Sequence, residues 1–297
     1  MSASALKVGY RAVKSRNRPQ YEDSLAVFQP RAYWQALTCG SVFAVADGVG
    51  GKPLAAEASQ IVTKTVVDSY CRDGTNRVTY RLWRAVADAN RRILKTSQQK
   101  RLPQTMSSTA VIAVIRGARI WVANVGDSRC YLVHGRKAKL LTKDHTFVAE
   151  GIRRKMFSQA EAAHHPMRSS LTQALGMRQR VLPALARARL KASDALLLCT
   201  DGLSDFVSER EIANVLSSSP PQQAAQALVN LAVRRHTRDD CTALVVKAIP
   251  HFSSTRHPRG AVPQSSARTR VDLRTLMACF LLSVSLMGIL VLALLAG

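Results

Sequence analysis

The sequence predicts an α+β protein in which antiparallel sheets are flanked by helices, followed by a single C-terminal transmembrane helix. The folded part is predicted by β-rich apolar runs that occur in clusters rather than in strict alternation with helical stretches. Gly117 stands between two of these runs, where a hairpin turn is expected. The membrane helix is predicted by residues 275–297, which carry no charged side chain and are rich in Leu, Val, Ala and Met.

Each element is predicted from its own pattern. The expected strands are, in chain order, Leu25–Phe28, Ser41–Ala46, Thr109–Ile115, Arg119–Val125, Cys130–Val133, Ala195–Thr200 and Thr242–Ala248. Helical spacing of apolar residues predicts helices at Leu54–Tyr70, Arg81–Ser97, Glu209–Leu216 and Gln222–Arg235. Ser208 and Glu211 form a capping box before the third helix, and Pro220-Pro221 opens the fourth.

The composition divides the chain into three parts. We expect a folded domain over residues 1–250, a basic Pro/Ser/Arg linker over 251–274, and a transmembrane anchor over 275–297. Arginines precede the apolar segment at positions 256, 259, 268, 270 and 274, opposed only by Asp272. Because positively charged flanks stay in the cytoplasm, the folded domain is expected on the cytoplasmic side.

The charge balance is strongly basic, with 43 Lys and Arg against 19 Asp and Glu, a net charge of +24. Such a surface attracts acidic lipid headgroups, nucleic acid or phosphorylated protein segments, and composition alone does not choose among them. The six cysteines are scattered without a C-x-x-C pair. We therefore expect buried thiols in a reducing compartment, and neither a zinc site nor a disulfide framework.

Acidic residues stand at the ends of several apolar runs. They are Glu22, Asp23, Asp47, Asp127, Asp201 and Asp239. Carboxylates buried together repel one another unless cations neutralise them, so the pattern indicates a bound metal cluster. Ligands that are all oxygen, with no nearby His or Cys, indicate a hard cation such as Mg²⁺ or Mn²⁺.

The ordered motifs in the chain resemble one family. R-x-x-x-E-D is followed by DGVGG, SSTA, GDSR, DH, LTQALG, TDGLSD and DDCT, over about Lys7 to Ile249. This series resembles the bacterial PP2C-type (PPM) metal-dependent serine/threonine protein phosphatases. The resemblance implies a four-layer α-β-β-α sandwich of two stacked antiparallel sheets flanked by helices.

The resemblance also implies a role for each motif residue. Asp47 would bridge two Mn²⁺ or Mg²⁺ ions, the Gly48 carbonyl would bind one of them, and Asp201 and Asp239 would be further direct ligands. Glu22 and Asp23 would hold the ligand set, and Asp127 with Asp201 would form a weak third metal site.

Arg18 would grip the substrate phosphate, since a guanidinium meets two phosphate oxygens at once. The catalytic set is thus Arg18, Asp47, Asp201 and Asp239, and a metal-activated water attacks phosphorus.

Some positions depart from the family pattern. Val49 stands where many eukaryotic members carry His, Tyr21 replaces the usual Asn before Glu-Asp, and Asp240 replaces the usual Asn after Asp239. We interpret His145 as structural, and residues 145–175 as a flap beside the active site.

The leading hypothesis is a phosphoserine/phosphothreonine phosphatase that acts on phosphorylated proteins and opposes a cytoplasmic or membrane-associated serine/threonine kinase in bacterial signalling. It would be a single-pass protein of the bacterial inner membrane and a monomer. The alternative is a membrane-tethered pseudophosphatase that only binds phosphoproteins. No nucleic-acid partner is expected, because no known binding motif accompanies the charge.

Overall fold

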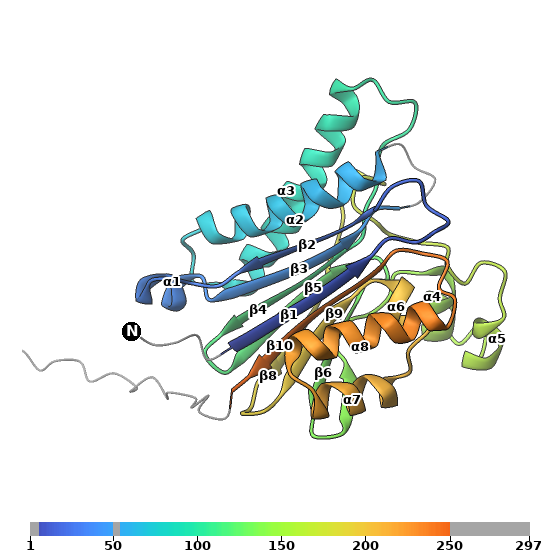
Figure 1. The fold of residues 1–297 in the computed structure, drawn as a ribbon. Helices are drawn as coiled ribbons and strands as arrows, with labels where there is room; N and C mark the ends of the chain where they lie inside the picture. The colour runs from blue at the N-terminus through green and yellow to red at the C-terminus, as the bar shows by residue number, and fades with distance from the viewer. Residues whose placement is uncertain (1–5, 50–53, 250–297) are drawn as a thin grey trace, which may run out of the picture. The chain divides into compact units, whose positions relative to one another are not determined.

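The computed structural model describes residues 6–49 and 54–249 (Figure 1). The chain divides into two units, Met1–Ser254 and Thr255–Gly297, and the second lies outside the described residues. The predicted linker and transmembrane anchor lie outside them as well. Across residues 6–49 and 54–249, no helix is both long and apolar enough to cross a membrane.

The sheet that we call sheet A has the strand order β1-β10-β9-β6-β7 and is antiparallel throughout. Its strands are β1 (Leu6–Val13), β6 (Arg129–His134), β7 (Lys137–Leu140), β9 (Ala195–Cys199) and β10 (Cys241–Ala248). Strands β9 and β10 are buried almost throughout, which explains why they read as continuous apolar runs rather than as alternating patterns.

Sheet B has the strand order β2-β3-β4-β5-β8 and is also antiparallel. Its strands are β2 (Asp23–Phe28), β3 (Ser41–Asp47), β4 (Ala110–Arg116), β5 (Arg119–Val125) and β8 (Ala184–Arg189). The central strands β3 and β4 are buried on both faces up to their last residue. The edge strand β8 alternates exposed and half-buried residues.

Helices cover the outer faces of both sheets. On sheet B, α2 (Ala55–Arg72) and α3 (Val78–Gln99) bury Val62, Leu82 and Ile93 in one core with strand residues such as Ile112. On sheet A, α7 (Glu209–Ser218) and α8 (Pro221–Arg234) form a second core. A third core joins residues of both sheets, including Phe43, Ile120, Leu196 and Leu244. The layers are therefore α-β-β-α, as the resemblance implied.

The strand registers give the sandwich two distinct ends. At one end Asp23 pairs with Asp47 and Val13 pairs with Cys241. At the other end Arg119 pairs with Arg189, and Leu6 pairs with Ala248. We call these the acidic end and the far end. Figure 1 shows α4 (Phe147–Arg153) and α5 (Gln159–Ala163) near the first, and α1 (Tyr33–Thr38) at the second.

The expected strands and helices all form, with small shifts at their ends. The helix expected at Arg81–Ser97, for example, runs over Val78–Gln99. Strands β1, β7 and β8, and helices α1, α4, α5 and α6 (Asp201–Ser204), were not predicted from the sequence. These missed elements are short or half exposed, so their sequences lack the long apolar runs by which the central strands were found.

The cysteine expectation is wrong for one pair. Cys39 and Cys71 form a disulfide, with their Cα atoms 5.5 Å apart, whereas we expected only free thiols. Cys39 follows α1 and Cys71 lies in the last turn of α2, so residues 32 positions apart in sequence meet only through the fold. Cys130, Cys199 and Cys241 are free and buried, as expected.

Candidate active site

Two carboxylates of sheet B face each other across neighbouring strands. Asp23, the first residue of β2, is the register partner of Asp47, the last residue of β3. Residues opposite each other in an antiparallel pair project their side chains to the same face. The backbone of Asp47 is held by the two residues that precede β4, since its carbonyl accepts from the Thr109 amide at 2.8 Å and from the Ser108 hydroxyl at 2.8 Å.

Sheet A contributes threonines and another aspartate to the same place. The hydroxyls of Thr200 and Thr242 donate to Asp23 Oδ2 at 3.0 and 2.6 Å. Thr200 also accepts from the Thr242 amide at 3.1 Å, so these two residues fix each other. Asp201 follows Thr200 directly, at the start of α6. The threonine pair therefore joins the acidic ends of the two sheets.

Arg18 connects two further carboxylates. Its Nε and Nη2 donate to the two carboxylate oxygens of Asp239 at 3.1 and 2.8 Å, and its Nη1 donates to Glu22 at 2.9 Å. Asp239 lies two residues before β10, and Glu22 lies immediately before β2. Hydrogen bonding to Asp239, together with the nearby charges of Glu22 and Asp47, raises the pKa of Arg18. The guanidinium is thus fixed between Glu22 and Asp239 at the acidic end.

Asp240 lies beside the other carboxylates, because its charge adds to burial in raising the pKa of Asp23 and of Glu22. Its two carboxylate oxygens accept from the backbone amides of Ser15 and Glu22, at 2.7 and 2.5 Å. The residue is only 1% exposed. Asp240 therefore fastens both ends of the loop that carries Arg18, a role that only the tertiary structure reveals.

Two glycines allow backbone segments to meet at this end. A Cβ at Gly48 would lie 2.3 Å from the Ala55 carbonyl oxygen, and a Cβ at Gly202 would lie 2.0 Å from the Asp240 carbonyl oxygen. Any side chain would push these segments apart. The glycines that follow Asp47 and Asp201 are therefore required by close packing.

Asp127 lies on the loop between β5 and β6, close to both Asp201 and Asp47. The charges of Asp201, Asp144 and Asp205 add to burial in raising its pKa well above the usual range. His145 is interior and accepts from the Gly126 amide through Nδ1 at 3.2 Å. His145 therefore supports the loop that carries Asp127, in agreement with its structural interpretation.

The shared electrostatic signature of the site is a set of carboxyl groups that resist ionisation. Burial is the largest cause in each case. It raises the pKa of Asp23 to about 8 and of Asp201 to about 6, and raises that of Asp47 well above normal. Asp47 also feels the charges of Asp23, Asp201, Asp239 and Asp127, which places all of these in one electrostatic neighbourhood. The cluster therefore attracts cations.

The donor set fits a hard divalent cation. Asp23 Oδ1 and Asp201 Oδ1 are buried, and within the described residues neither has a hydrogen-bond partner. Buried carboxylate oxygens without donors are costly unless a cation meets them. Among the described residues, no group of three or more His, Cys, Asp or Glu side chains has the geometry of a complete metal site. Arg18 donates to both Glu22 and Asp239, so a cation held by Asp239 would share that carboxylate with Arg18 or displace it.

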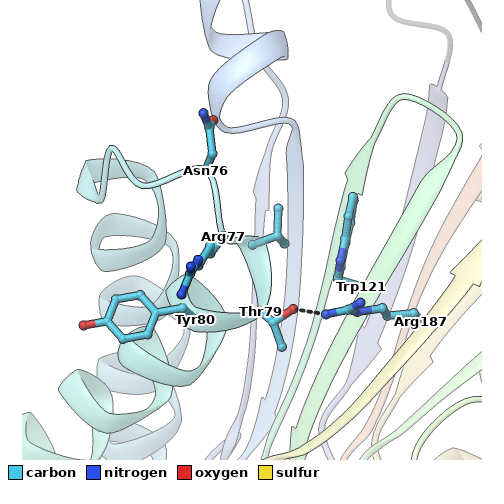
Figure 2. A pocket seen from close by; sticks show the side chains of 7 residues that line it. Asn76, Arg77, Thr79, Tyr80, Trp121 and Arg187 are labelled. Carbon is cyan, nitrogen blue, oxygen red and sulfur yellow. Dashed lines mark hydrogen bonds between the residues drawn. The ribbon is translucent and has the colours of Figure 1, made fainter. Parts of the chain in front are cut away.

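A surface cavity of about 390 Å³ lies elsewhere, between the start of α3 and strands β5 and β8 (Figure 2). Its lining residues are Asn76, Arg77, Val78, Thr79, Tyr80, Trp121 and Arg187. None of the motif residues lines it, so this cavity is separate from the acidic end.

The structure brings together Arg18, Glu22, Asp23, Asp47, Gly48, Asp201 and Asp239, with Asp127 adjacent through Asp201. Sequence reasoning missed the supporting residues Thr200, Thr242, Ser108 and Tyr21, whose hydroxyl bonds Thr242. Thr200 and Thr242 were visible inside the TDGLSD and DDCT motifs, but nothing in the sequence showed that both contact Asp23.

A two-sheet sandwich with carboxylates gathered at one end of its strands defines a class, that of proteins whose acidic side chains bind hard divalent cations. The family comparison is more specific. The model of the family described as protein phosphatase 2C matches residues 20–233. The chain belongs to the protein phosphatase 2C family, and it is a metal-dependent serine/threonine protein phosphatase.

Individual relatives agree with this assignment. The serine/threonine phosphatase stp of Listeria monocytogenes is 29% identical over 244 residues, covering 80% of this chain and 94% of the relative. The crystal structure of the Mycobacterium tuberculosis serine/threonine phosphatase PstP/Ppp matches with a TM-score of 0.72 at 29% identity, covering 82% of this chain and 99% of the other. A structure of the PstP catalytic domain in complex with two manganese ions matches with a TM-score of 0.69 at 28% identity, covering 82% and 98%.

Proposed function

We propose that this phosphatase removes phosphate from phosphoserine and phosphothreonine in proteins at the cytoplasmic face of a membrane, using the acidic end of its sandwich. The observation that carries the proposal is the meeting of Asp23, Asp47, Asp201 and Asp239 with Arg18. These residues come from distant parts of the chain, and neither sheet alone would place them together.

The residues that would hold the cations are Asp47, the Gly48 carbonyl, Asp201 and Asp239, with Glu22 and Asp23 as supporting acids. When bound, two Mn²⁺ or Mg²⁺ ions supply positive charge for the phosphoryl oxygens and the means to activate water. The two manganese ions bound by PstP support this choice. Asp127, beside Asp201, would serve a weaker third site.

Arg18 has a distinct role in binding the substrate phosphate. In the structure its guanidinium donates to both Asp239 and Glu22, which holds it beside the carboxylates of the site. A phosphate that replaces Asp239 as the partner of Arg18 would free the Asp239 carboxylate for a cation. Exchange of the two anions on one guanidinium couples substrate and metal binding, because a guanidinium offers paired donors to either one.

The membrane assignment rests on sequence. Residues 275–297 have the length and apolar character of a spanning helix, and the basic linker 251–274 favours a cytoplasmic catalytic domain. The natural counterpart of such an enzyme is a serine/threonine kinase that acts near the same bacterial membrane. We expect the chain to work as a monomer and without nucleic acid.

Turnover by the full-length chain tests the proposal. With Mn²⁺ and a phosphothreonine peptide, we expect phosphate release that stops on chelation and falls at least about 100-fold in Asp47→Asn and Asp239→Asn. Asp68→Asn is the matched control, since Asp68 is an exposed acid on α2. Tight peptide binding with no release would instead indicate the pseudophosphatase alternative. Unchanged rates in both active-site variants would refute the assignment of these residues.

A further inference from the structure

The far end of the sandwich carries a dense set of basic side chains. Strand registers place the ends of β4, β6 and β8 and the starts of β1 and β5 there. The basic residues of this end, which we call the basic far end, are Lys7, Arg31, Arg116, Arg119, Arg136, Lys137, Arg187, Arg189 and Lys191. Arg116 is half-buried, and the others are exposed. Such charge clustered on one end favours a large anionic partner.

Acidic side chains do little to neutralise this surface. Asp194 is 2% exposed and accepts from the Lys191 amide and from His134. The Asp73 side chain is 4% exposed and pairs with Arg84. Asp68, one turn before the end of α2, is the exposed exception. No residue of the basic far end forms an ion pair with an acid among residues 6–49 and 54–249. Their positive charge is therefore available to a partner.

Exposed aromatic rings accompany these charges on α1. Tyr33 is 81% exposed and Trp34 is 64% exposed, and α1 buries none of its residues. The helix is nevertheless firmly attached, because the carbonyl of its last residue, Thr38, accepts from the buried Arg81, and the following Cys39 is disulfide-bonded to Cys71. Tyr and Trp are the residues enriched where protein meets the interface of a bilayer.

The cavity of Figure 2 extends the same surface along the outer face of sheet B. Arg187, which donates to the Thr79 hydroxyl at 2.7 Å, is the register partner of Trp121, and the next pair on that face is Arg119 with Arg189. Arg77, at the start of α3, lines the cavity from the other side. Arginine and aromatic side chains thus continue from the far end into a depression large enough for a polar headgroup.

Chain connectivity indicates which anionic partner this surface meets. Strand β10 ends at Ala248, at the far end, where the Ala248 amide donates a hydrogen bond to the Asp194 carbonyl. In sequence, residues 250–274 follow this strand and precede the apolar segment 275–297. We propose that the basic far end, with Tyr33 and Trp34, docks on the anionic lipid surface of the membrane. This proposal builds on the membrane anchorage proposed above.

The docked orientation has a functional consequence. The acidic end lies at the opposite ends of the same strands, and the seven residues of β3 alone span about 23 Å. A domain resting on its far end would hold Asp47 and Arg18 away from the lipid and facing the cytoplasm. Substrates would then be approached at a fixed distance from the membrane.

Fluorescence of Trp34 tests the proposal in the full-length chain. Trp83→Phe together with Trp121→Phe leaves Trp34 as the only tryptophan, and retained phosphatase activity shows that the variant folds. In vesicles of phosphatidylcholine with phosphatidylglycerol, we expect brominated lipid to quench Trp34 at least about twofold more than in phosphatidylcholine alone. Arg119→Glu with Arg189→Glu should remove that difference. Arg210→Glu with Arg234→Glu, exposed arginines of α7 and α8, is the matched control and should retain it.

The outcomes separate docking from anchorage. Retention of the chain on vesicles after alkaline carbonate extraction reports the anchor alone. If the chain is retained but Trp34 quenching is the same in both kinds of vesicle and in both double variants, docking is refuted while anchorage stands. If carbonate removes the chain yet Trp34 is quenched in a salt-sensitive way only with anionic lipid, docking stands and anchorage fails.

Discussion

The Asp240 carboxylate accepts a hydrogen bond from the backbone amide of Glu22 at 2.5 Å, and its second oxygen accepts from the Ser15 amide at 2.7 Å. These two bonds hold both ends of the loop in which Arg18 lies. Asp240, which follows Asp239, thus positions Arg18 by holding the backbone of its loop, and it forms no ion pair with Arg18 in the described residues.

Replacing Asp240 should therefore loosen the phosphate-binding loop. Asp240→Ala leaves two buried amides without acceptors, which costs about 2–4 kcal/mol of folding free energy and should raise KM more than it lowers kcat. Denaturant unfolding and steady-state kinetics measure the two effects. Asp194→Ala is the control, because Asp194 also accepts from a backbone amide but lies at the far end. Equal KM changes in both variants would contradict a role for Asp240 in positioning Arg18.

Substitution of Arg18 should weaken phosphate binding specifically. Arg18→Ala removes the paired donors that now meet Asp239 at 3.1 and 2.8 Å, and we expect kcat/KM to fall about 10- to 100-fold, mainly through KM. Arg18→Lys should recover little, since an ammonium lacks the planar fork. Arg16→Ala, an exposed arginine two residues earlier, should behave like wild type. A similar loss in Arg16→Ala would mean that general basicity of the loop is what matters.

The buried Asp23 carboxyl predicts how stability depends on pH in the absence of cations. Burial raises its folded pKa from 3.8 to about 8, opposed by the Thr242 hydrogen bond, so the folded state binds the proton more tightly than the unfolded state does. The extra proton affinity of folded Asp23 adds to the free energy of unfolding. This contribution is fully present below pH 3.8 and is lost as the pH rises to about 8. With cations removed by a chelator, the Tm of wild type should fall relative to that of Asp23→Asn as the pH rises from 5 to about 8.5. Asn is chosen because its side-chain oxygen still accepts from Thr200 and Thr242. A constant difference in Tm across this range would contradict the raised pKa. Added Mn²⁺ should restore most of the wild-type loss at high pH, because the cation replaces the proton.

The Cys39–Cys71 disulfide predicts a redox-dependent stability. It closes a loop of 32 residues, and loss of such a link costs about 3–4 kcal/mol in the chain-entropy model. Cys71→Ser should lower the unfolding free energy by about this amount under oxidising conditions, and a reductant should lower wild type to the same value. Cys241→Ser, at a buried free thiol, keeps the disulfide, so the stability of this variant should still fall on addition of reductant, whereas that of Cys71→Ser should not respond. Equal thiol counts before and after reduction of unfolded wild type would show that the bond does not form.

The sequence by itself determined the central strands, the four long helices and the identity of the acidic residues. Strands such as β3 and β10 are recognisable because burial on both faces demands continuous apolar runs, and their flanking Asp and Gly residues stand in a specific order. The strand β8 and the helix α1 could not be found this way, since half of β8 is exposed and α1 buries nothing.

Only the tertiary structure decided which groups meet. Register between β2 and β3 sets Asp23 against Asp47, and contact between the two sheets brings Thr200 and Thr242 to Asp23. The same fold turns Asp240 inward, joins Cys39 to Cys71, and gathers scattered arginines at the end opposite the acids. Local sequence encodes the burial and conformation of a segment, whereas distances between remote side chains arise from how sheets and helices pack.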